Sequence, residues 1–170
     1  MDVFEAVKTR RSIRSYEDKP IEKEKLIKIL EAARLSPSAN NNQPSQFIVV
    51  SNKTIRESLL EVYPHHWFTK APVIIVTCSL PESSWTRQDG ENYWKVDATI
   101  ALENMILVAH ELGLGTCWVA AFNEDKTKEL LRIPKEVRVI ALTPIGYPAE
   151  HKGPVTQRKP LTEIVHYERW

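Results

Sequence analysis

Three arginines and one serine lie within five residues near the start of this 170-residue chain. Arg10, Arg11 and Arg14 surround Ser12 just beyond a short helix predicted at residues 2–10. In so short a span these side chains can surround one phosphate with charge-assisted, partly bidentate hydrogen bonds, each contributing on the order of 1.5–3 kcal/mol. A basic, solvated helix end, which the helix dipole favours, would have the same sequence. The spacing alone leaves both interpretations open.

A second candidate is the polar loop at residues 36–45, with the sequence Ser-Pro-Ser-Ala-Asn-Asn-Asn-Gln-Pro-Ser. Its hydroxyl and amide side chains donate and accept hydrogen bonds without carrying charge, which suits the edge of a polar heteroaromatic ring. The same residues are also typical of an ordinary turn-forming loop.

A third candidate is the segment 113–122, Gly-Leu-Gly-Thr-Cys-Trp-Val-Ala-Ala-Phe. Glycine and other small residues allow the backbone to approach a ligand closely. A tight turn between a helix and a strand is the alternative interpretation of this segment.

The elements that must position these segments alternate irregularly between helix and strand. Helices are predicted at residues 2–10, 22–34, 54–62, 93–112 and 124–131, the longest one ending at Gly113. Strands are predicted at residues 47–50, 73–76, 116–119 and 137–144. The tail after Pro148 has strand character only at residues 161–165, which indicates that it reaches over another surface such as a second subunit.

The absence of regular β-α-β alternation and of a G-x-G-x-x-G motif after a strand argues against a Rossmann fold. We expect a single α+β domain over residues 1–170, built as a three-layer α/β/α sandwich around a small mixed sheet.

Composition narrows the function class. The 23 basic and 22 acidic residues leave a net charge of +1, which argues against a general nucleic-acid or membrane-surface binder. The longest apolar stretch, residues 96–114, is interrupted by charged residues and is predicted to be a buried helix. No secretory signal is visible, so we expect a cytoplasmic protein with Cys78 and Cys117 as free thiols. The histidines are too scattered to predict a metal site.

Four stretches, taken in order, resemble the nitroreductase family of flavin mononucleotide (FMN)-dependent enzymes. They are R-R-S-I-R at 10–14, I-L-E-A-A-R-L-S-P-S-A-N-N-N-Q-P at 29–44, D-A-T-I-A-L-E-N-M-I-L-V-A-H-E-L-G-L-G-T-C-W at 97–118, and I-G-Y-P at 145–148. The resemblance implies a nitroreductase-like fold with a mainly antiparallel sheet. It also implies an intertwined homodimer that holds two FMN molecules between its subunits.

The resemblance carries roles over to particular residues. Arg10, Ser12 and Arg14 would contact the FMN phosphate and ribityl chain, with Arg11 beside them. Arg158 would close on the same phosphate, and Lys152 is a second candidate there. The loop facing the flavin of the opposite subunit would include Pro37, Ser38, Ala39, Asn41 and Gln43. The backbone lying along the isoalloxazine ring would be that of Trp118, Val119, Ala120 and Ala121.

The implied activity is transfer of a hydride from NADH or NADPH through FMN to a nitro, quinone or similar small-molecule acceptor, with ping-pong kinetics. The cofactor would carry the chemistry, so no catalytic residue is predicted. The alternatives are a flavin-dependent dehydrogenase or dehalogenase for one metabolite, and a non-enzymatic flavin redox-sensing module. Ser45 stands where many family members have tryptophan, and residues 65–94, the predicted pocket lip, match the family poorly.

Overall fold

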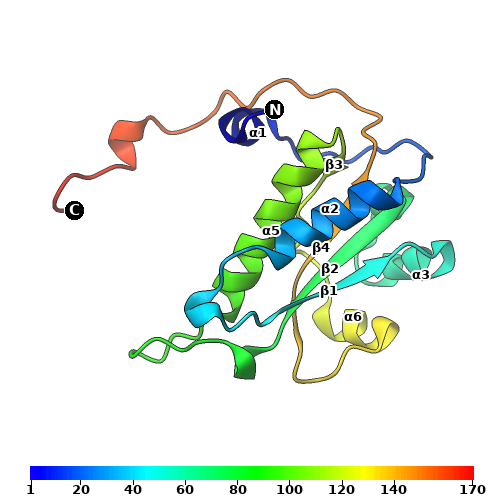
Figure 1. The fold of residues 1–170 in the computed structure, drawn as a ribbon. Helices are drawn as coiled ribbons and strands as arrows, with labels where there is room; N and C mark the ends of the chain where they lie inside the picture. The colour runs from blue at the N-terminus through cyan, green and yellow to red at the C-terminus, as the bar shows by residue number, and fades with distance from the viewer.

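A four-stranded antiparallel sheet with strand order β1-β2-β4-β3 lies at the centre of the computed structural model, which describes all 170 residues (Figure 1). The strands are β1 (Ser45–Val50), β2 (Val73–Ser79), β3 (Gly115–Thr116) and β4 (Arg138–Gly146). All three strand pairs are antiparallel, and Ile75 of β2 lies opposite Val49 and Thr143. The one parallel contact is an isolated bridge between Ser12 and Thr116, which lies outside the strand pairs. The sheet itself is antiparallel, in line with the expected mainly antiparallel sheet.

Six α-helices accompany the sheet. They are α1 (Val3–Thr9), α2 (Lys23–Arg34), α3 (Lys53–Ser58), α4 (His66–Lys70), α5 (Trp94–Glu111) and α6 (Glu124–Leu131). Short 3-10 turns occur at Ala39–Asn41, Leu59–Glu61, Pro81–Ser83 and Leu161–Glu163. No helix combines the length and the apolar character needed to cross a membrane.

Helices cover both faces of the sheet, because successive side chains of β2 point in opposite directions. Ile75 packs with Ile29 of α2 and Leu102 of α5, whereas Ile74 packs with Leu59 and Phe68 on the other face. Figure 1 shows α2 and α5 along one face and α3 and α6 on the other. The predicted three-layer α/β/α sandwich is therefore confirmed.

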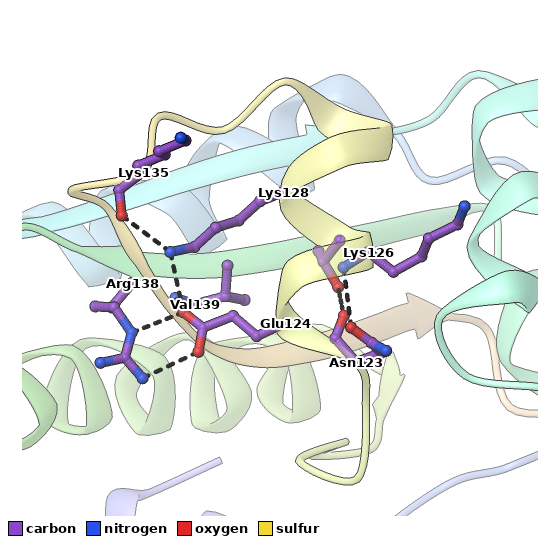
Figure 2. A network of polar contacts seen from close by, with 8 residues as sticks. Asn123, Glu124, Lys126, Lys128, Lys135, Arg138 and Val139 are labelled. Carbon is purple, nitrogen blue, oxygen red and sulfur yellow. Dashed lines mark hydrogen bonds and ion pairs between the residues drawn. The ribbon is translucent and has the colours of Figure 1, made fainter.

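Helix α6 is attached to the beginning of β4 by a polar network (Figure 2). The Glu124 carboxylate accepts hydrogen bonds from the Arg138 guanidinium at 2.8 and 3.0 Å and from the Val139 backbone N–H at 2.9 Å. Asn123 caps the helix by accepting from the Lys126 N–H at 2.9 Å. The network fixes the end of β4 that lies away from β3.

Three segments differ from the sequence prediction. Residues 161–165 do not form a strand, because no strand of this chain lies beside them; a 3-10 turn at Leu161–Glu163 forms instead. Helix α4 was not predicted, since its aromatic and β-branched residues have low helix propensity, and it forms around the fully buried Phe68. Of the predicted third strand, residues 116–119, only Thr116 pairs continuously with β4. The observed strand begins one residue earlier, at Gly115, and is followed by a single bridge from Val119 to Leu142.

The end of the chain extends beyond the rest of the domain (Figure 1). Several of its apolar side chains are exposed: Leu161, Ile164, Val165, Tyr167 and Trp170. This tail therefore buries little apolar surface within its own chain.

Candidate functional site

The predicted phosphate-binding residues lie together around one hollow of about 270 Å³. Its lining is Arg10, Arg11, Ser12, Arg14, Lys152, Val155 and Arg158. Five of these seven side chains are cationic, although the whole chain carries a net charge of only +1. Residues from both ends of the sequence thus concentrate positive charge at one place.

The Arg10–Arg14 segment is held in place by its contacts with β3 and α5. The Ile13 N–H donates to the Thr116 carbonyl at 2.8 Å. Gly115 allows this approach, because a Cβ there would lie 2.7 Å from Cγ1 of Ile13. The end of α1 is held by a 2.8 Å contact between the Thr9 hydroxyl and Nε2 of His110 on α5. Burial, and then the charge of Arg10, lower the pKa of His110.

Glu150 and Lys152 attach a second loop to the same segment. The Glu150 carboxylate accepts from the Arg14 backbone N–H, and this hydrogen bond is the main reason that the pKa of Glu150 is lowered. Lys152 Nζ donates to the Ser12 carbonyl at 2.8 Å and lies 3.0 Å from the Glu150 carboxylate. Glu150 was not predicted from the sequence, because it acts on a backbone group 136 residues away.

The segment after β3 offers unpaired backbone donors. Ala120 and Ala121 are exposed, and their backbone N–H groups make no hydrogen bond to other backbone groups. Trp118 is half-buried and Val119 is buried. Cys78 and Cys117 are both buried and free, as expected, and burial raises the pKa of the Cys117 thiol.

The polar loop has an unusual backbone. Asn40, Asn41 and Gln43 have φ angles of 53°, 55° and 51°, in the left-handed region. The Ser38 hydroxyl accepts from the Gln43 N–H at 2.9 Å, and the Ser38 carbonyl accepts from the Asn41 N–H at 2.9 Å. Pro37, Ser38 and Gln43 line a hollow of about 260 Å³.

One chain does not bring the polar loop and the cationic hollow together. The loop contacts Asp97 near the start of α5, whereas Thr9, next to Arg10, contacts His110 near its end. At 1.5 Å per helical residue these two positions are separated by roughly 20 Å. Figure 1 shows the two segments at opposite ends of α5.

The available groups fit FMN. Five cations and a hydroxyl suit a phosphate, and free backbone N–H groups at Ala120 and Ala121 suit the polar edge of a flavin ring. The model of the Nitroreductase family matches residues 7–63 and 60–147. The chain belongs to the nitroreductase family.

Individual members of the nitroreductase family are similar to this chain over most or all of their length. A Methanothermobacter thermautotrophicus protein, named for NADH dehydrogenase and NAD(P)H nitroreductase, is 41% identical over 100% of this chain and 88% of its own. A crystal structure of a nitroreductase family protein from Clostridium difficile 630 has a TM-score of 0.92 and 35% identity, covering 100% of both chains. An FMN-dependent nitroreductase from Clostridium difficile R20291 has a TM-score of 0.83 and 34% identity, covering 95% of this chain and 96% of its own.

Proposed function

We propose that this protein passes a hydride from NADH or NADPH through bound FMN to a nitro compound, a quinone or a similar acceptor. The chain is an FMN-dependent NAD(P)H oxidoreductase of the nitroreductase family. The observation that carries the proposal is the hollow lined by five cationic side chains, together with the unpaired backbone donors at Ala120 and Ala121.

The cationic hollow would bind the phosphate. Arg10, Arg14 and Arg158 would donate to its oxygens, and the Ser12 hydroxyl would add a neutral donor. Glu150 and Lys152 already hold the backbone of this segment, so little ordering is required when the phosphate binds.

The exposed segment at Ala120 and Ala121 would orient the ring. Its N–H groups can donate to the polar edge, and its methyl side chains leave room for a ligand to stack. The chemistry that FMN supplies when bound is hydride acceptance followed by electron delivery. If the nicotinamide and the acceptor occupy the same exposed face of the flavin ring in turn, the kinetics are ping-pong. The reaction then requires no general acid or base from the protein.

A second copy of the chain would complete the site. The polar loop of one chain lies too far from its own cationic hollow, and exposed apolar side chains are available to form an interface. On α1, α5 and the tail these are Val3, Phe4, Val7, Val96, Ile100, Leu161, Ile164, Tyr167 and Trp170. We expect an intertwined homodimer in which each polar loop faces the flavin bound to the partner chain.

The dimer can be tested directly by light scattering. The purified protein is expected to have twice the 19.6 kDa mass of the chain and to bind two FMN molecules per dimer. A monomer with one tightly bound FMN would contradict the shared site, because a single chain would then be sufficient to form it.

Anaerobic titration tests the activity. The yellow protein is expected to lose its visible flavin absorbance on addition of about one equivalent of NADH or NADPH per flavin, since a hydride carries the two electrons that flavin accepts. Several unrelated quinones and nitroaromatics should then restore the absorbance. Bound flavin that neither nicotinamide reduces would contradict the proposed electron donor, and reoxidation by one acceptor alone would indicate a dedicated metabolic enzyme.

A further inference from the structure

Asp97 is a buried carboxylate with no cationic partner. Only 2% of the residue is exposed. Its oxygens accept from the Ala39 backbone N–H at 2.9 Å and from the Ser84 hydroxyl at a longer 3.4 Å. Burying a carboxylate costs free energy that hydrogen bonds must offset, and the position in the first turn of α5 adds the favourable helix dipole. The shorter of the two hydrogen bonds of Asp97 joins it to Ala39 of the polar loop.

A second side chain of α5 holds the beginning of the same loop. Asn104 Nδ2 donates to the Ser36 hydroxyl at 2.7 Å, and that hydroxyl donates to the Ala32 carbonyl at 2.8 Å. Asp97 and Asn104 are seven residues apart, so they lie about two turns apart on one face of α5. Helix α5 therefore fixes the loop at Ser36 and again at Ala39.

The loop residues with an unfavourable backbone conformation follow Ala39 directly. Asn40, Asn41 and Gln43 are all in the left-handed region. Such conformations persist only where the surrounding structure determines them strongly, and they are concentrated at functional sites. The hydrogen bond from Ala39 to Asp97 fixes the chain immediately before this strained stretch.

We propose that Asp97 is a positioning residue that holds residues 36–43 in the shape that receives the flavin ring of the partner chain. The inference rests on the proposed function, because it assigns this loop to the ring end of the site. Asp97 would act on the flavin indirectly, through its hydrogen bond to the Ala39 N–H. The loop is thus formed before flavin binds, and it does not order around it.

The test compares FMN with riboflavin, which has the same ring system but lacks the phosphate. We expect Asp97→Ala apoprotein to bind both ligands more weakly by the same factor, roughly 10- to 100-fold, since a hydrogen bond to a charged group is lost at the ring end. Asp97→Asn keeps an acceptor oxygen and should restore most of the affinity. At saturating FMN, Asp97→Ala should also shift the flavin midpoint potential. Asp125→Ala, which removes an exposed carboxylate from the first turn of α6, is the matched control.

The outcomes separate this inference from the proposed function. Unchanged riboflavin affinity in Asp97→Ala, or equal weakening by Asp97→Asn, would overturn the positioning role. Arg10→Ala with Arg14→Ala should weaken FMN but not riboflavin, and equal weakening of both ligands there would contradict the phosphate site instead. Hydrogen exchange on the wild-type apoprotein covers the case in which Asp97→Ala does not fold. The Ala39 amide should be protected without FMN, and rapid exchange there would overturn the proposal.

Discussion

Replacing both Arg10 and Arg14 by alanine is expected to weaken FMN binding roughly 100- to 10,000-fold, because two charge-assisted hydrogen bonds to one phosphate are lost. The two guanidiniums lie in the same hollow as Arg158 and Lys152, so residual affinity should remain. The measurement is a fluorescence titration of apoprotein with FMN, since flavin emission changes when the ring is bound. A purified double variant that still carries one FMN per chain would contradict the phosphate assignment.

A matched control separates the local contacts from the general charge of the protein. Lys23→Ala with Lys53→Ala also removes two positive charges, from exposed positions outside the hollow. Long-range attraction between charges is screened by salt, so this control should bind FMN almost as wild type does at physiological ionic strength. A similar loss in both double variants would indicate that only net charge matters.

Most residues that the sequence analysis singled out have a local signal, whereas Arg158 and Lys152 were assigned only through the family resemblance. Arg10, Arg11, Ser12 and Arg14 are adjacent in sequence, so their chemistry is visible before folding. Helix α6 begins and ends where predicted; Asn123 caps its start, and Arg132, in the left-handed region, ends it. Three further sequence segments occur in the order expected for the nitroreductase family, and this order allowed the family to be recognised.

The residues that were missed act across long sequence separations. Asp97 bonds to a backbone group 58 residues away, and Glu150 to one 136 residues away. A lone carboxylate carries no spacing pattern that predicts such a partner; its role depends on where the fold places it. Helix α4 was missed for a related reason, because burial of Phe68 outweighs the low helix propensity of its sequence.

Substitution of Gly115 by alanine is expected to damage both stability and flavin binding. The added Cβ would lie 2.7, 2.8 and 2.9 Å from Cγ1, Cβ and Cγ2 of Ile13. Ile13 cannot rotate out of the way, because one of the clashing atoms is its own Cβ and the residue is only 7% exposed. The backbone around Ile13 must therefore move away from β3, which strains its hydrogen bond to Thr116.

Overpacking of this kind costs about 1–3 kcal/mol, so the free energy of unfolding of Gly115→Ala should fall by that amount in urea denaturation of the apoprotein. FMN affinity should fall by about tenfold or more, because Ser12 and Arg14 move with Ile13. Gly153→Ala is the matched control: it lies beside Lys152, yet an added Cβ there meets nothing within 4 Å. If Gly115→Ala matched this control in both measurements, the close contact between β3 and the arginine segment would not be what positions the phosphate site.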